Sequence, residues 1–304
     1  MGKPTNIRIT NRAGLPEPLV AAVSNDPYDP GEAEFTVTEL LSPPRQTQLI
    51  REHAGELSED AADRIYALMG QVAHEILARA GENGIREERL SGRVEVFGKH
   101  RTISGAFDHM ALIEAGPEMV LQDYKIASVW EAIFGVKPDR VAQLNALAWL
   151  AEQNGKRVDR LEVVFIFRDW QKSKAKRDSK YPSQPALVYP VPFWNAARVE
   201  QELRRQMISH LAAREILPEC TPDERWEAPE SWAVYRNANK RASRVLDTEE
   251  NAIRWAGANF KPNDRARIEL RPGESRRCLD YCIALAVCEQ GQALVNVEEA
   301  PSDD

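Results

Sequence analysis

Met119-Val120-Leu121-Gln122-Asp123-Tyr124-Lys125 is the stretch on which the prediction of the fold turns, because an apolar strand ends there in a carboxylate and an ammonium group. Successive side chains of a strand point to opposite faces, so Asp123 and Lys125 share one face. Tyr124 takes the other face and offers its backbone carbonyl nearby. A carboxylate at the end of an apolar strand is costly to bury unless it is paired or bound to a metal. A simple buried Asp–Lys ion pair would leave the same tripeptide.

Two further strands are predicted before this one, and the three together form an antiparallel meander. Residues 94–96 and 102–113 alternate apolar and polar positions, and glycines lie at the turns between the strands. Asp108 lies on the middle strand, and neighbouring strands are about 4.8 Å apart. Asp108 and Asp123 can therefore share a hard cation such as Mg²⁺, which takes oxygen ligands and polarises a phosphoryl group. An aspartate that simply faces water at a strand end would also account for Asp108.

Helices are predicted before and after the meander. Apolar residues recur at helical spacing over residues 58–80 and again over residues 139–152. Residues 161–167 are almost entirely apolar, as in a buried central strand, and residues 192 to about 217 are helical. This order of helix, three strands, helix, strand and helix predicts an α/β fold with a mixed central sheet flanked by helices.

Two polar side chains on the predicted helices belong to the same series. His74 borders the buried face of the first helix, and an imidazole can join carboxylates around Mn²⁺. Gln143 opens the helix that follows the last strand of the meander. Taken singly, such a histidine is more often a hydrogen-bonded core or surface residue, and glutamines are common on helix surfaces.

The series as a whole resembles the RecB-type branch of the PD-(D/E)xK nuclease superfamily. That branch has a Gly-x-x-x-His helix, a Gly-x-x-Asp strand, an (Asp/Glu)-x-Lys strand and a Gln-x-x-x-Tyr helix. Over about residues 36 to 170 this chain has counterparts in the same order, which are Gly70 with His74, Gly105 with Asp108, Asp123 with Lys125, and Gln143. One departure is the tyrosine of the last motif, which is Leu147 here.

The resemblance implies a restriction-endonuclease-like core and a role for each residue of the series. It implies that Mg²⁺ or Mn²⁺ is bound by His74, Asp108, Asp123 and the carbonyl of Tyr124. It also implies that Lys125 positions the nucleophilic water and that Gln143 supports the site or contacts the DNA backbone. The catalytic residues expected on this basis are Asp108, Asp123, Lys125 and Gln143.

All four cysteines lie in the second half of the chain, at Cys220, Cys278, Cys282 and Cys288. Cys278 and Cys282 are four residues apart and share one face if their segment is helical, so both can hold one ion or cluster. Four thiolates suit an iron–sulfur cluster or a structural Zn²⁺. Free cysteines are also often small buried core residues.

The cysteines are similar in arrangement to those of the four-cysteine nucleases of the same superfamily, which include AddB and the CRISPR-associated nucleases. In those proteins one early cysteine joins a late triplet to hold an iron–sulfur cluster. The resemblance therefore implies a cluster in this chain, with Zn²⁺ as the alternative. Here Cys220 would replace the early cysteine, because Ser42-Pro43-Pro44-Arg45 at the start of the core contains none.

Basic side chains gather in two places although the formal net charge is −7, from 40 basic and 47 acidic residues. This overall charge argues against a general nucleic-acid coat but is compatible with a local basic track. Residues 168–180 hold six basic and two acidic residues. A predicted hairpin at residues 232–246, followed by a helix capped at residues 247–250, carries more. We expect contacts with DNA phosphates, or solvation alone, for Lys172, Lys174, Lys176, Arg177, Arg241 and Arg244.

The chain divides by composition into five segments. They are an extended N-terminal segment (1–34), the nuclease core (35–220), a small ββα insert (221–265), a cysteine segment for a metal or cluster (266–290) and an acidic tail (291–304). No apolar run approaches the roughly 20 residues that a membrane span needs, and the first residues do not resemble a secretory signal. We expect a cytoplasmic protein of a bacterial cell, and the full pattern is most like phage-encoded members of the superfamily.

The sequence thus predicts a metal-dependent deoxyribonuclease, and specifically an exonuclease in phage or bacterial recombination or repair. DNA is the expected substrate, and a single-strand annealing or other recombination protein is an expected partner. Leu147 in place of the motif tyrosine motivates an alternative, which is a DNA- or protein-binding subunit on the same fold that is active only through partners. A zinc-stabilised endonuclease without iron is a third interpretation.

Overall fold

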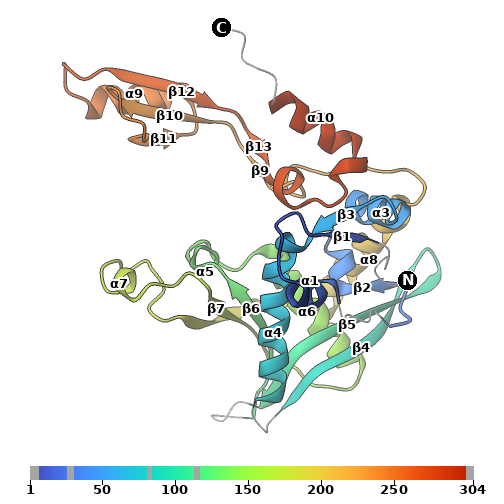
Figure 1. The fold of residues 1–304 in the computed structure, drawn as a ribbon. Helices are drawn as coiled ribbons and strands as arrows, with labels where there is room; N and C mark the ends of the chain where they lie inside the picture. The colour runs from blue at the N-terminus through green and yellow to red at the C-terminus, as the bar shows by residue number, and fades with distance from the viewer. Residues whose placement is uncertain (1–6, 26–30, 81–83, 113–116, 299–304) are drawn as a thin grey trace. The chain divides into compact units, whose positions relative to one another are not determined.

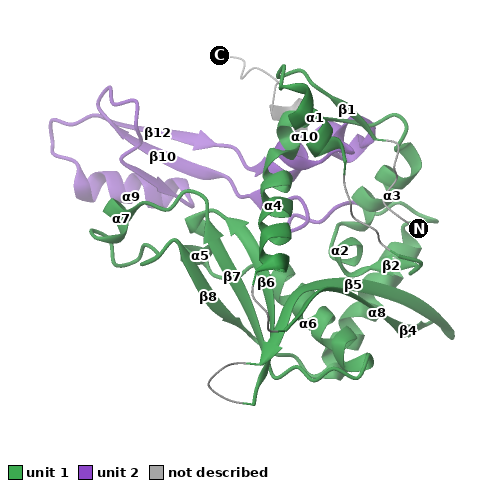
Figure 2. Ribbon diagram, turned by 60° about the horizontal axis from the view of Figure 1, so that its bottom comes forward, with its two compact units in different colours: residues 1–218 green, residues 219–304 purple. Residues whose placement is uncertain are grey.

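The computed structural model describes residues 7–25, 31–80, 84–112 and 117–298 (Figure 1). The chain forms two compact units, which comprise residues 1–218 and residues 219–304 and are called unit 1 and unit 2 below (Figure 2). A lipid bilayer could not be spanned by any helix in the described ranges, because none combines the necessary length and apolarity.

Unit 1 is built around a mixed sheet with the strand order β2-β5-β6-β7-β8, in which β4 also pairs with β5. The β2–β5 and β6–β7 pairs are parallel, and the β4–β5, β5–β6 and β7–β8 pairs are antiparallel. The expected meander and the expected central strand are therefore confirmed. The strands are β2 (Phe35–Thr36), β4 (Ile85–Val96), β5 (Lys99–Leu112), β6 (Met119–Ala127), β7 (Arg160–Phe167) and β8 (Ala186–Val191).

Helices flank this sheet, which confirms the predicted fold class (Figure 2). The helix α4 lies across β5 and β6 on one face, and α6 and α8 cover the other face. Shorter helices precede and connect the strands. The bounds are α2 (Val37–Leu40), α3 (Pro44–His53), α4 (Ile65–Arg79), α5 (Val129–Phe134), α6 (Pro138–Gln153), α7 (Lys172–Ala175) and α8 (Ala196–Ala212).

The main core lies between the sheet and α6, where every residue from 144 to 151 is buried. Gly105 on β5 makes this packing close. A Cβ atom at this position would lie 2.6 Å from Leu147 Cδ2 and 2.9 Å from Val37 Cγ2. Leu147 is thus a core residue of α6 and is 2% exposed. The glycine of the expected Gly-x-x-Asp strand is needed because α6 and α2 approach the backbone there.

The opposite face of the sheet is less well covered. None of the residues of α4 is buried, and several apolar residues that the helical pattern assigned to a buried face are exposed. Met69, Val72 and Ile76 are 41%, 50% and 56% exposed. The helical period was therefore predicted correctly, but the burial of this stripe was not.

The start of unit 1 differs from the extended segment that composition predicted. It contains β1 (Arg8–Thr10) and α1 (Glu17–Ser24), and β1 pairs in parallel with β3 (Ser58–Asp60). Residues 58–60 are therefore a strand and not the first turn of a helix. Asp60 accepts hydrogen bonds from Thr10, from the backbone of Arg12 and from Ala62, so it joins β1 to a short 3₁₀ turn before α4.

Unit 2 contains the predicted hairpin and the helix capped by Thr248, and it adds a strand. Residues 266–271, expected in the cysteine segment, form β12 and pair with β10. Residues 289–298 form a helix in part of the expected acidic tail, and the remainder, 299–304, lies outside the described residues. The elements are β9 (Glu227–Ala228), β10 (Ser231–Arg236), β11 (Arg244–Leu246), α9 (Glu249–Asn259), β12 (Ala266–Arg271), β13 (Glu274–Ser275) and α10 (Glu289–Glu298).

Candidate metal centre

The two predicted aspartates lie where β5 and β6 separate. The antiparallel pairing of these strands ends at His109 and Gln122, so Asp108 and Asp123 hold the next positions. Asp108 Oδ2 accepts a hydrogen bond of 2.7 Å from the backbone N–H of Tyr124. This side-chain bond replaces a bond between the strands, and it fixes the Asp108 carboxylate against β6.

Asp123 and Lys125 point to the same face, as the alternation of the strand predicts. Lys125 Nζ donates a hydrogen bond of 2.6 Å to Asp123 Oδ1. Asp123 is 3% exposed, and its Oδ2 atom has no hydrogen-bond partner among the described residues. Burial raises the pKa of Asp123; the Lys125 ammonium opposes this rise, and the Asp108 carboxylate adds to it. A buried carboxylate oxygen without a partner is unfavourable, so this position fits a cation.

His74 on α4 meets the same group of carboxylates. Its Nδ1 atom lies 3.4 Å from Asp108 Oδ1 and 3.4 Å from Glu87 Oε1. The ligand atoms of these three residues all lie within 4.8 Å of one another. Hydrogen bonds to Asp108 and then to Glu87 raise the pKa of His74 to about 10. The imidazolium therefore supplies, in this structure, a positive charge that a bound metal ion could supply instead.

Glu87 is the residue of this group that the sequence did not single out. On β4 it lies opposite Asp108, between the pairs Arg86–His109 and Glu88–Phe107. Its φ angle of 48° is in the left-handed region, where a residue with a side chain is strained. Glu87 lies in a run of charged residues that gives no sign of which side chain turns inward.

The helix α6 carries the expected residue Gln143 and also Arg140. Gln143 is half-buried, and no hydrogen bond or ion pair of its side chain is found in the described ranges. Arg140, three residues earlier, lowers the pKa of Asp123 through its charge. Its guanidinium is held by two hydrogen bonds to Glu131, of 3.0 and 3.1 Å. Arg140 thus acts electrostatically on Asp123, and the expected role of Gln143 stays a prediction.

The four cysteines come together within unit 2. The Gln290 side chain accepts a hydrogen bond of 2.8 Å from the Cys220 N–H and donates one of 3.0 Å to its carbonyl. The Gly291 N–H donates to Cys288 Sγ at 3.4 Å. Burial, then Glu224 and then the other three thiols raise the pKa of Cys220 to about 12. Segments that are far apart in sequence thus bring four thiols within electrostatic reach, although no three Sγ atoms in the described part of the chain lie within 4.8 Å of one another.

The basic residues expected to contact DNA are all exposed or half-buried at the surface. Lys172, Lys174, Lys176 and Arg177 lie on and after α7, in the connection between β7 and β8 of unit 1. Arg241 precedes β11 and Arg244 begins it in unit 2. Their role in DNA binding stays a prediction.

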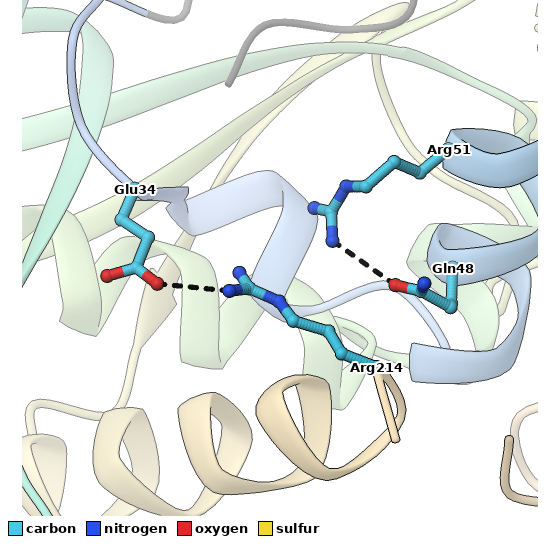
Figure 3. A pocket seen from close by; sticks show the side chains of 4 residues that line it. All are labelled: Glu34, Gln48, Arg51 and Arg214. Atoms are coloured by element: carbon cyan, nitrogen blue, oxygen red, sulfur yellow. Dashed lines mark hydrogen bonds and ion pairs between the residues drawn. The ribbon is translucent and has the colours of Figure 1, made fainter. Parts of the chain in front are cut away.

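A pocket of about 400 Å³ lies elsewhere in unit 1 and is lined by Glu34, Gln48, Arg51 and Arg214 (Figure 3). Arg214 pairs with Glu34 at 3.2 Å, and Arg51 pairs with Glu39 at 2.5 Å. Because both guanidinium groups are already neutralised by carboxylates, this pocket is a weaker candidate for an anion site than its two arginines suggest.

No protein-family model matches the chain, and no curated protein matches it either. Among solved structures, it is similar to the crystal structure of SSO0001, with 16% identity and a TM-score of 0.42, over 62% of this chain and 81% of that chain. It is also similar to an alkaline exonuclease (LHK-Exo) from Laribacter hongkongensis, with 14% identity and a TM-score of 0.35, over 60% of this chain and 90% of that chain. TM-scores of 0.42 and 0.35 are too low to support an inference about function.

Proposed function

We propose that the chain is a metal-dependent deoxyribonuclease that hydrolyses phosphodiester bonds of DNA, and that it acts as an exonuclease. The observation that carries this proposal is the buried Asp123 carboxylate. One of its oxygens is bound to Lys125, and the other has no hydrogen-bond partner among the described residues. A simple Asp–Lys ion pair would not account for Asp108, whose charge acts on Asp123 and whose carboxylate also lies within 4.8 Å of the ligand atoms of His74 and Glu87.

The donor atoms at this point suit Mg²⁺ or Mn²⁺. Carboxylate oxygens are the ligands that hard cations prefer, and an imidazole nitrogen is compatible with Mn²⁺. A divalent cation held there would polarise the phosphoryl group of the substrate. The ligands we propose are His74, Glu87, Asp108, Asp123 and the carbonyl of Tyr124.

The side chains of the candidate site would have separate roles in hydrolysis. Lys125 Nζ orients the attacking water, which loses a proton to the solvent as its oxygen bonds to phosphorus. The bond to the leaving oxygen breaks, and that oxygen takes up a proton from the solvent. The Lys125 ammonium offsets the negative charge that develops on the phosphoryl oxygens. Asp123 holds Lys125 in place through the 2.6 Å hydrogen bond. The reaction needs no covalent bond between enzyme and DNA.

The remaining parts of the functional prediction rest on the resemblance and on charge. We propose that the side chains of Lys172, Lys174, Lys176 and Arg177 contact DNA phosphates. A role in phage or bacterial recombination or repair, with a single-strand annealing protein as partner, is likewise a proposal. A supporting role for Gln143 at the site or on the DNA backbone is a further one.

Digestion of DNA labelled at the 5′ or the 3′ end, in duplex and single-stranded form, tests the proposed activity. We expect cleavage with Mg²⁺ or Mn²⁺ and none with a chelator, and we expect Lys125→Ala to abolish it. An exonuclease releases the end label as short products, whereas an endonuclease also cuts closed circular DNA. Full activity of Lys125→Ala would contradict the proposal.

We also propose that Cys220, Cys278, Cys282 and Cys288 hold an iron–sulfur cluster. A tetrahedral Zn²⁺ with bonds of about 2.3 Å to sulfur would bring its thiolates to about 3.8 Å from one another. Four thiolates are equally the ligand set of an iron–sulfur cluster. Elemental analysis of protein purified without oxygen decides between them, because iron with acid-labile sulfide supports the cluster and zinc alone excludes it.

A further inference from the structure

Two loops of unit 2 are tied together at one end of its three-stranded sheet. Asn237, directly after β10, donates its backbone N–H to the Arg265 carbonyl and accepts the Arg265 N–H on Oδ1, both at 2.8 Å. Its Nδ2 donates to Asp264 Oδ1 at 3.1 Å. Asn237 has a φ of 54°, a conformation that asparagine adopts more readily than most residues. The β10–β11 loop and the α9–β12 loop are therefore held side by side.

Cations are concentrated on these two loops. Arg265 and Lys261 come from one loop, and the β10–β11 loop supplies Lys240 and Arg241, with Arg244 where it enters β11. We call these five residues the basic tip. All five are exposed, and in the described part of the chain none of them forms an ion pair. The carboxylate next to them, Asp264, is already bound by Asn237 and by the Lys261 N–H.

The sheet face that joins the basic tip carries Arg267 and Arg271 and one carboxylate, Glu269, which forms an ion pair of 3.1 Å with Arg267. Val234 and Ile268 pack against α9, so the alternating residues of β10 and β12 lie on the opposite face. There the Arg267 guanidinium lies 4.5 Å from the centre of the Tyr235 ring, and Arg271 donates to the Tyr235 hydroxyl at 3.1 Å. These contacts hold two guanidinium groups in fixed positions on the exposed face.

The positive charge of this region differs from the net negative charge of the whole chain. Residues 231–271 contain more basic than acidic residues, whereas the whole chain contains 40 basic and 47 acidic ones. Surfaces that bind nucleic acid are strongly positive and polar, whereas the centres of protein–protein interfaces are depleted of charge. A polyanion with regularly spaced charges is therefore the occupant that this surface fits best.

We propose that the basic tip and the adjoining sheet face bind the phosphate backbone of DNA, as a second contact in addition to the metal centre. The proposal rests on the proposed function in so far as DNA is the substrate. Binding at the basic tip needs neither metal nor cleavage, so it can be measured separately. Because the contacts are to phosphates, the affinity depends on salt and not on base sequence.

Fluorescence anisotropy of a labelled duplex, with the full chain and without divalent metal, measures this binding. Each phosphate that a basic side chain neutralises contributes about 0.9 to the exponent of the salt dependence, so removing one such side chain at about 0.1 M salt weakens binding by about eightfold. We expect this weakening of binding by about eightfold for Arg241→Gln. Each of two double variants, Lys240→Gln with Arg241→Gln and Lys261→Gln with Arg265→Gln, should weaken binding by about the square of that factor. The matched control is Arg254→Gln, an exposed arginine on α9 outside the basic tip, and it should bind like the unchanged chain.

The slope of log K against log salt should become shallower by about 0.9 for each basic side chain that is replaced. The substituted residues are exposed, and unchanged thermal unfolding verifies that the variants fold. The inference is overturned if both double variants keep the affinity and the salt slope of the Arg254→Gln control. Cleavage is scored separately: if the unchanged chain binds through the basic tip but cuts no DNA, the proposed function fails and this inference stands.

Discussion

Replacing the buried carboxylate of the candidate metal centre by an amide should separate activity from stability. Asp123→Asn keeps the shape of the side chain and removes its charge. Asp123 Oδ2 has no partner among the described residues, and Asp123 is 3% exposed, so the aspartate is itself an unfavourable feature of the metal-free fold. We expect the variant to lose cleavage and to keep its stability.

The magnitudes follow from the interactions of Asp123. Removing the unpaired buried oxygen charge gains about 1 to 3 kcal/mol, and weakening the bond to Lys125 loses a similar amount, about 1.5 to 3 kcal/mol. The Lys125 side chain is 22% exposed and can reach water, so it does not become a buried unpaired charge. The free energy of unfolding should therefore change by less than about 1 kcal/mol. The loss of a metal ligand removes about 4 kcal/mol of transition-state stabilisation, which is about a thousandfold in rate.

Urea unfolding of the metal-free protein and single-turnover cleavage of end-labelled DNA measure the two quantities. Asp159→Asn is the matched control, because its carboxylate accepts the Met119 N–H at 2.8 Å at the start of the same strand. The control should unfold at lower urea and cleave at the normal rate. If Asp123→Asn cleaves within about tenfold of the unchanged chain, or loses more stability than the control, Asp123 is a structural residue and the reasoning fails.

Three further predictions concern the same region. Glu87→Gln should weaken Mn²⁺ binding by about tenfold or more, measured by calorimetry, and unchanged affinity would exclude Glu87 as a ligand. Because the pKa of His74 is raised from 6.5 to about 10, its contribution to the stability of the metal-free fold is complete below pH 6.5 and is lost as the pH rises to about 10. Urea midpoints should thus fall over that range, and less so in His74→Gln; parallel curves would contradict this. Gly105→Ala should lower the free energy of unfolding by about 1 to 3 kcal/mol, because its Cβ would meet Leu147 and Val37; unchanged urea unfolding would show that α6 can move away.

The sequence predicted those elements whose pattern is local and strong. The meander and α6 follow from periods of two and of 3.6 residues that persist over many positions. The strand β8 was missed because it is a short edge strand that contains Pro190, and proline ordinarily argues against a strand. The helix α3 was not predicted, although Pro44 lies in its first turn, where proline is favoured.

The residues of the candidate metal centre could be predicted only as far as they occur in a fixed order along the chain. His74, Asp108, Asp123 and Lys125 follow the series of motifs, and the structure brings them together. Glu87 could not be found in this way, because its position depends on a left-handed backbone angle and on the pairing of β4 with β5. The same holds for Arg140, whose effect on Asp123 depends on how α6 packs.

Three local features of the candidate metal centre together argue for a bound cation. Asp123 has a buried oxygen without a partner among the described residues, Glu87 adopts a strained backbone angle, and His74 carries a proton far above its ordinary pKa. The unpartnered oxygen of Asp123 and the backbone angle of Glu87 lower stability, and such features concentrate at functional sites. The proton on His74 instead offsets the charge of Asp108 and Glu87, as a cation would. A divalent cation held by Asp108 and Glu87 would replace the proton on His74, and one that also bound Asp123 Oδ2 would give that oxygen a partner. A role in folding alone would be met more simply by apolar residues at these positions, as it is on the α6 side of the same sheet.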